Sequence, residues 1–92
     1  MQIHHEGNRK KGVFYYLENE TKIAEMTYTY SGTDKIIINH TGVSEAYNGT
    51  GLGKMLVKAG VDFARTNNLK VIPQCPFAKK IIEHTPEYAD VL

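Results

Sequence analysis

The chain contains 92 residues, of which 41% are hydrophobic and 23% are charged, and its formal net charge is +1. A chain of this length builds one domain with a small core, because the fraction of surface that folding buries falls with size. Dimerisation, or a partner that completes the site, is therefore one expectation. The near-neutral charge lacks the strong positive field that draws proteins to nucleic acids or anionic membranes, so we expect neither partner.

Two absences in the sequence bear on location. There is no apolar run of about 20 residues, the length needed to span a bilayer, and residues 1–12 lack the apolar stretch of a signal peptide. The single cysteine, Cys75, excludes an intramolecular disulfide. We expect a cytoplasmic protein in which residues 1–12 form a polar N-terminal segment and residues 13–92 form a single domain.

Three strands are predicted in the first half of this domain. Residues 13–19 are rich in Val, Phe, Tyr and Leu, which favours a strand. Residues 22–30 alternate between an apolar and a polar face. A third strand is centred on residues 36–38 and runs to about Gly42. Because only short links join the three strands, they predict an antiparallel meander.

The pattern becomes helical after a loop at residues 43–50. From Gly51 onward, apolar residues recur at helical spacing, and residues 69–74 then read as a fourth strand. A helix joins this strand to the third, so the two are expected to be parallel. A short helix over residues 76–83, with Phe77 turned inward, completes the order βββαβα. This order predicts an α/β (α+β) fold in which helices cover a mixed sheet.

A glycine-rich loop leads into the first helix, with the sequence Asn48-Gly49-Thr50-Gly51-Leu52-Gly53-Lys54. Glycines let the main chain approach a ligand closely, and the N–H groups at a helix start carry a partial positive charge. Such a loop predicts an anion site suited to phosphate. It is not the dinucleotide fingerprint, which needs Gly where Lys54 stands. Nor is it the P-loop, which needs Gly and Ser or Thr where Asn48 and Met55 stand. A tight turn before a helix explains the same residues.

The loop resembles the R/Q-x-x-G-x-G/A loop with which the GNAT acetyltransferase superfamily holds the pyrophosphate of acetyl-CoA. Here Asn48, Gly51 and Gly53 occupy the defined positions. Asn48 departs from the pattern, because its side chain is shorter than Arg or Gln and carries no charge, which implies a weaker hold on the pyrophosphate. Residues 10–92 also resemble a subfamily of very short GNAT-like proteins. That resemblance lies in His40-Thr41, Tyr47–Gly53, Ala64-Arg65, Val71–Phe77 and His84–Tyr88.

The resemblance implies a minimal GNAT-like fold that binds acetyl-CoA. It further implies that the third and fourth strands splay apart and that the pantetheine arm enters between them. Lys79 and Lys80 are within reach of the 3′-phosphate of coenzyme A, although an exposed helix face explains them equally. The residues implied in acetyl-CoA binding are Tyr47, Asn48, Gly49, Thr50, Gly51, Leu52, Gly53 and Lys54.

Strand alternation places two reactive side chains near the expected ligand. His40 would share a face with Ile36 and Ile38, and Cys75 would follow the fourth strand. In parallel neighbours both lie at the C-terminal edge, where ligands of open α/β sheets bind. We therefore expect His40 and Cys75 both to lie at the edge where the ligand binds.

Several roles are open for these side chains. Cys75 is a candidate nucleophile activated by His40, a proton donor to the coenzyme A thiolate, a redox-sensitive thiol, or simply a buried structural residue. His40 is a candidate general base for an amine acceptor or a structurally hydrogen-bonded histidine. On resemblance alone, Tyr88 is an alternative proton donor. No metal site is expected, because His4-His5-Glu6 is a lone cluster in a terminus expected to fray.

Three functions remain. The first is an N-acetyltransferase that moves an acetyl group from acetyl-CoA to a small amine or a protein lysine by direct attack, with a main-chain N–H of the fourth strand polarising the thioester carbonyl. The second is an acetyl-CoA-binding module with little or no turnover, because the N-terminal helices that shape the acceptor site of full-length relatives are missing from this sequence. The third is a small structural domain with a glycine turn.

Overall fold

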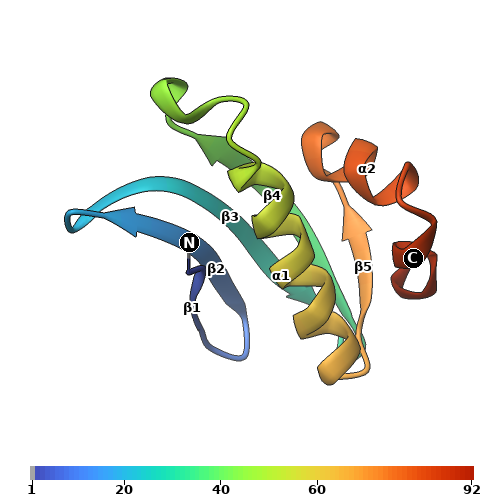
Figure 1. Cartoon of the computed structure of the whole chain (residues 1–92). Helices are drawn as coiled ribbons and strands as arrows, with labels where there is room; N and C mark the ends of the chain where they lie inside the picture. Colours follow the sequence, from blue (N-terminus) through green and yellow to red (C-terminus); the bar gives the residue numbers. More distant parts are fainter. Residues whose placement is uncertain (1) are drawn as a thin grey trace.

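The computed structural model describes residues 2–92. It contains a five-stranded sheet, α-helices α1 and α2, and 3-10 helices η1 and η2 (Figure 1). The elements are, in chain order, β1 (His4–Gly7), β2 (Lys11–Glu18), β3 (Thr21–Ser31), β4 (Lys35–Val43), η1 (Glu45–Tyr47), α1 (Leu52–Thr66), β5 (Lys70–Pro73), α2 (Pro76–Glu83) and η2 (Pro86–Val91).

The sheet runs in the order β1-β2-β3-β4-β5. Neighbours from β1 to β4 pair antiparallel, and β5 pairs parallel to β4 after the crossover through α1. The antiparallel meander, the parallel pairing of β4 with β5 and the mixed α/β class are therefore confirmed. The sheet has one strand more than the sequence predicted.

The additional strand, β1, lies within the segment expected to be polar and frayed, of which Met1 lies outside the described residues. The His5 ring stacks on Phe14 at 4.2 Å between centroids and meets the Phe63 ring edge-on at 4.7 Å. Its Nε2 also lies 2.6 Å from the Tyr28 hydroxyl. The expectation of a frayed end is wrong because a polar histidine provides the ring that fastens this strand to the core.

The hydrophobic core lies between the sheet and α1, which crosses one face of the sheet (Figure 1). Met26, Tyr28 and Ile38 are buried on the sheet side. Leu56 and Val61 are among the buried residues of α1. Gly60 allows α1 to pack closely on the sheet, because an added Cβ at this position would lie 2.6 Å from the Met26 Cε.

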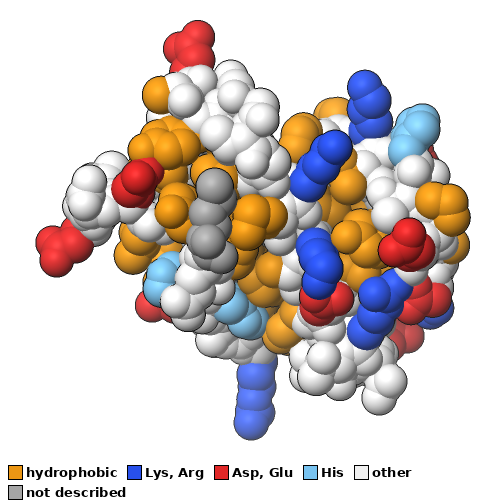
Figure 2. All heavy atoms as spheres, in the orientation of Figure 1, with side chains coloured by type: hydrophobic (Ala, Val, Ile, Leu, Met, Phe, Trp, Pro, Cys, Tyr) orange, Lys and Arg blue, Asp and Glu red, His pale blue; other side chains and the backbone are white. Residues whose placement is uncertain are grey.

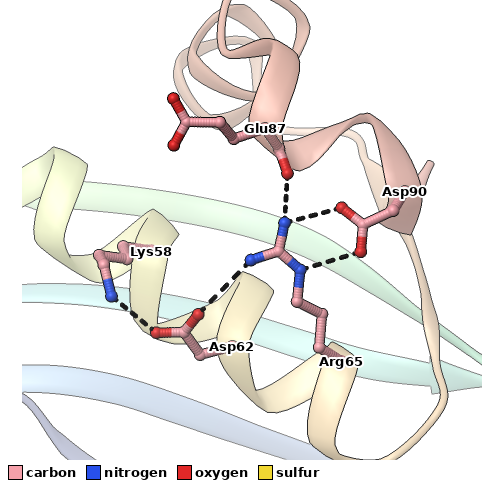
Figure 3. Close-up of polar contacts among 5 residues, drawn as sticks. All are labelled: Lys58, Asp62, Arg65, Glu87 and Asp90. Carbon is pink, nitrogen blue, oxygen red and sulfur yellow. Dashed lines mark hydrogen bonds and ion pairs between the residues drawn. The ribbon is translucent and has the colours of Figure 1, made fainter.

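The C-terminal turn η2 is fastened to the end of α1 by Arg65 (Figure 3). Its guanidinium donates two hydrogen bonds to the Asp90 carboxylate, at 2.9 and 2.7 Å, and a third to the Glu87 carbonyl. The bidentate pair is the geometry that gives guanidinium–carboxylate contacts their specificity. These contacts hold the last residues of the chain beside α1 and α2.

Candidate functional site

The sheet opens where β4 and β5 part. Their ladder ends with Ile38 opposite Pro73, while β4 continues to Val43. The N–H groups of Gln74 and Cys75 both donate to the Ile38 carbonyl at 3.1 Å before the chain turns into α2. Figure 1 shows the ends of the two strands diverging, with α1 beginning between them. The splay that the resemblance implied is present.

Free main-chain donors surround the start of α1. The amides of Tyr47, Asn48 and Thr50 are bonded to carbonyls within the loop. Five other amides of this segment have no acceptor within residues 2–92. Four of them lie at the helix start, before the first helical bond, which runs from the Met55 N–H to the Gly51 carbonyl. They carry the partial positive charge of the helix start. These free amides belong to Gly49, Gly51, Leu52, Gly53 and Lys54.

Two glycines give the loop its path. Gly49 and Gly51 have φ angles of 82° and 86°, in the left-handed region that side chains with a Cβ rarely adopt. Open space surrounds both positions, since no atom lies within 4 Å of a Cβ built there. Side chains of the rest of the protein therefore leave the main chain of Gly49 and Gly51 uncovered.

The free amides border a pocket of about 200 Å³. It lies between the glycine loop, the end of β4 and the Phe77 ring of α2, which packs directly on Gly53. Phe77 was expected to turn inward, but its side chain is 44% exposed. The ring packs on Gly53 at the start of α1 instead of entering the core. The lining residues are Val43, Tyr47, Asn48, Gly49, Gly51, Leu52, Gly53, Lys54 and Phe77.

Three of the predicted loop residues are held differently from the glycines. The Tyr47 hydroxyl donates to the Glu18 carboxylate, a hydrogen bond that raises the pKa of Tyr47 together with burial and the Glu18 charge. The Thr50 hydroxyl donates to the Tyr47 carbonyl at 2.6 Å, while Asn48 is exposed. The hydroxyls of Tyr47 and Thr50 thus stabilise the conformation of the loop.

A larger groove of about 590 Å³ adjoins the pocket, since Lys54 and Phe77 line both. Lys80 contributes a second cation, and neither hollow is lined by Asp or Glu. Figure 2 shows basic side chains gathered on this face of the molecule, where α1 and α2 lie in Figure 1. The groove is lined by Lys54, Phe77, Lys80, Ile81, His84, Thr85 and Tyr88.

Cys75 lies at the N-cap of α2 and is buried. Burial raises the pKa of its thiol, but the polar groups that face it, the main chain of Ala78, the Thr41 side chain and the main chain of Phe77 and Thr41, outweigh burial, so the pKa is lowered. Helix N-termini commonly favour the thiolate in this way. The pKa of the Cys75 thiol is therefore lower than burial alone would make it.

His40 does not lie on the face of Ile36 and Ile38, so this prediction is wrong. A β-bulge shifts the register, so that Tyr28 pairs with Ile38 while its neighbour Thr27 pairs with His40. Successive residues of a strand point to opposite faces, which puts Ile38 and His40 on opposite sides of the sheet. His40 is exposed and lines a hollow with Glu25.

Thr41 takes the place that alternation had given to His40. It pairs with the buried Met26, so it points to the core face on which Cys75 packs. The sequence showed Thr41 only as part of a resemblance, with no role. The bulge at Asn39 leaves no clear mark in an isolated strand, so no residue pattern could have found this exchange.

The remaining predicted site residues lie elsewhere. Tyr88 lines the basic groove, with the Arg65 guanidinium 5.7 Å from its ring centroid, whereas Cys75 lines neither hollow. The fourth strand of the sequence prediction is β5, and an N–H of this strand was expected to face a ligand. At the C-terminal end of β5 this is wrong, because the Gln74 and Cys75 amides are bonded to the Ile38 carbonyl and Pro73 has no N–H.

Two features are absent from residues 2–92. No cluster of three His, Cys, Asp or Glu side chains in this range could hold a metal ion. No helix in this range is long and apolar enough to cross a bilayer.

Known proteins of similar sequence match this chain over most of its length. A family model described as GCN5-related N-acetyl-transferase matches residues 13–91. Protein NATD1 from Gallus gallus is 35% identical over 63 residues, which are 68% of this chain and 57% of the relative. The chain therefore matches little more than half the length of that relative.

Solved structures give the same result. A GCN5-like protein from Staphylococcus aureus, described as a candidate N-acetyltransferase and solved by NMR, has a TM-score of 0.77 and 42% identity, covering 98% of this chain and 85% of its own. A GNAT family acetyltransferase from Elizabethkingia anophelis, solved with acetyl-CoA bound, has a TM-score of 0.62 and 17% identity, covering 70% of this chain and 42% of its own. The latter likeness shows the fold alone. By its family match and its fold, this chain belongs to the GCN5-related N-acetyltransferases.

Proposed function

We propose that the protein binds acetyl-CoA and acts as an N-acetyltransferase toward a small amine or a protein lysine. The row of free main-chain N–H groups at the start of α1, which opens on the pocket beside the β4–β5 gap, is the observation that carries the proposal. Converging N–H groups at a helix start suit a diphosphate without needing a charged side chain. The uncharged Asn48 is then no obstacle to binding.

The adjoining groove suits the adenosine end of the same molecule. Phe77 offers an exposed ring on which adenine can stack, and aromatic–base stacking contributes about 1–3 kcal/mol. Lys54 and Lys80 supply cations for the 3′-phosphate. Lys79 does not line the groove, so Lys80 is the proposed contact of the two neighbouring lysines.

Acetyl-CoA, when bound, supplies an acetyl group activated as a thioester. Acetyl transfer by direct attack needs a donor for the carbonyl oxygen and a base for the amine proton. We assign the donor to the main chain of β4 beyond Ile38, where β5 no longer pairs with it. His40 reaches the gap only from the opposite face of the sheet, so it would serve as base only for an acceptor that approaches from that face.

The lowered pKa of Cys75 bears on its role in this reaction. A larger thiolate fraction favours a nucleophile over a proton donor. On that route the Cys75 Sγ forms a bond to the acetyl carbon as the bond from that carbon to the coenzyme A sulfur breaks. Coenzyme A leaves as its thiolate and takes up a proton. The acceptor amine then forms the new C–N bond, loses a proton and releases the Cys75 thiolate.

A binding module with little turnover is the second candidate. The displacement of His40 to the far face favours it, because no base predicted from the sequence remains next to Cys75. The two functions differ in one measurement. Coenzyme A release from acetyl-CoA that rises with added amine supports the enzyme, whereas tight binding without release supports the module.

Binding is tested by calorimetry with acetyl-CoA on two matched glycine variants. Gly51→Ala forces a side chain into a left-handed backbone at the start of α1, and we expect the affinity for acetyl-CoA to fall about tenfold or more, since one or two displaced amide contacts are worth about 1.4 kcal/mol or more. Gly32→Ala introduces the same kind of strain at φ 69°, in the turn between β3 and β4. It should leave the affinity unchanged. Equal affinity in all three proteins would refute the proposed site.

A further inference from the structure

Thr41 has an unusual position for a hydroxyl side chain. The bulge in β4 turns it to the core face, opposite the fully buried Met26, at the place where β4 has already lost its pairing with β5. Its neighbours along this face are therefore the core on one side and the β4–β5 gap on the other. A valine would fill such a position without introducing a polar atom.

The Thr41 hydroxyl is buried and is not satisfied. Its Oγ1 has no hydrogen-bond partner of good geometry within the described residues, and no other buried side-chain nitrogen or oxygen in that range shares this condition. A buried hydroxyl without a partner is costly. Native structures rarely keep one unless it has a use.

Cys75 lies at the same gap and on the same core face as Thr41, because it packs in the core and its N–H donates to the Ile38 carbonyl at 3.1 Å, where the β4–β5 ladder ends. The Thr41 side chain and main chain contribute to lowering the pKa of Cys75, although the Thr41 hydroxyl falls short of full hydrogen-bond geometry. The main chain of Ala78 and Phe77 approaches the same sulfur from the start of α2. No charged side chain contributes to this pKa, so amides and one hydroxyl surround the sulfur.

We propose that Thr41 is a positioning residue whose hydroxyl donates a hydrogen bond to the Cys75 thiolate and holds its sulfur at the β4–β5 gap. A thiolate accepts hydrogen bonds more strongly than a thiol, so the hydroxyl that lacks a partner in the resting structure gains one when Cys75 ionises. The hydroxyl thereby favours the reactive form of the thiol. This inference rests on the proposed function for its purpose, and on the geometry of Thr41 and Cys75 for its existence.

The test is a titration of the thiol in the absence of acetyl-CoA. Cys75 is the only cysteine of the chain, so thiolate absorbance and the pH profile of alkylation report on this residue alone. In Thr41→Val, which keeps the shape and removes the hydroxyl, we expect the pKa of Cys75 to rise by about one unit, which lowers the thiolate fraction about tenfold below that pKa. Thr41→Ser restores the hydroxyl and should return the pKa toward its original value.

A control variant and a second variant complete the design. Thr27→Val makes the same change on the neighbouring residue pair, on the other face of the sheet, and should leave the thiol titration unchanged. If Thr41→Val does not fold, as judged by circular dichroism, Thr41→Ala serves in its place against Thr41→Ser. An unchanged pKa in folded Thr41→Val or Thr41→Ala overturns the proposal, as does a serine variant that titrates like valine.

This experiment separates the inference from the proposed function. A raised thiol pKa in Thr41→Val together with a failed acetyl-CoA titration would leave the pairing of Thr41 with Cys75 standing and remove acetyl transfer. Normal acetyl-CoA binding with an unchanged thiol pKa in Thr41→Val would remove the pairing of Thr41 with Cys75 and leave the proposed function standing.

Discussion

At the scale of single residues, the site depends more on main-chain geometry than on side-chain identity. The path of the loop through Gly49 and Gly51 could be predicted from the sequence, because glycines directly before an amphipathic helix favour a left-handed backbone there. The exchange of His40 for Thr41 could not be predicted. One extra residue in β4 reverses which side chains face the core, and a single strand carries no record of the register of its partner.

His5 shows a second effect at this scale, and it makes stability depend on pH. Burial raises the pKa of Tyr28 to about 12, so its hydroxyl keeps its proton and donates to Nε2 of a neutral His5. Burial lowers the pKa of His5 from 6.5. The folded state therefore binds a proton at this site less readily than the unfolded chain does.

The sign of the effect follows from this difference. Below pH 6.5 the unfolded chain takes up a proton that folded His5 resists, so the free energy of unfolding should fall as the pH drops through 6.5 toward the lowered value. Urea denaturation at about pH 7.5 and about pH 5.5, on either side of the ordinary histidine pKa, measures it. His5→Gln should reduce the loss of stability between the two pH values, whereas His4→Gln should retain it. A loss of the same size in His5→Gln would contradict this assignment.

At the scale of elements, most of the fold could be predicted because its signals are local. The strand alternation, the helical spacing after Gly51 and the short links each involve neighbouring residues. Two features depend instead on contacts between elements. β1 is held by the ring of His5 on Phe14 and Phe63, and Phe77 is exposed because it covers Gly53 on another helix. Patterns within one segment do not contain either contact.

At the scale of the whole molecule, a net charge of +1 conceals an uneven distribution. The pocket and the groove are lined by Lys54 and Lys80 without an acidic residue. Asp62 of α1 is instead paired with Lys58, and Asp90 of η2 is paired with Arg65 (Figure 3). A local positive field of this kind can attract a polyanionic ligand to one face while the rest of the surface stays balanced.

This distribution predicts different effects for two adjacent lysines. Lys80→Gln removes a cation from the groove and should weaken the binding of coenzyme A several-fold, but should weaken the analogue without the 3′-phosphate much less. Lys79→Gln removes the same charge from a position outside the groove and should change neither affinity much. Competition binding with the two ligands measures the difference. Equal losses in both variants would show that the effect comes from net charge, with no contact to the 3′-phosphate.

The central claim is that acetyl-CoA binds at the start of α1 through main-chain N–H groups. Nuclear magnetic resonance of the ¹⁵N-labelled protein during titration with acetyl-CoA tests it most directly, because each amide of the loop gives its own signal. We predict saturable shifts of the amides of Gly49 and residues 51–54, with smaller shifts in the turn that holds Gly32. Unmoved signals for these amides at saturating acetyl-CoA would contradict the claim.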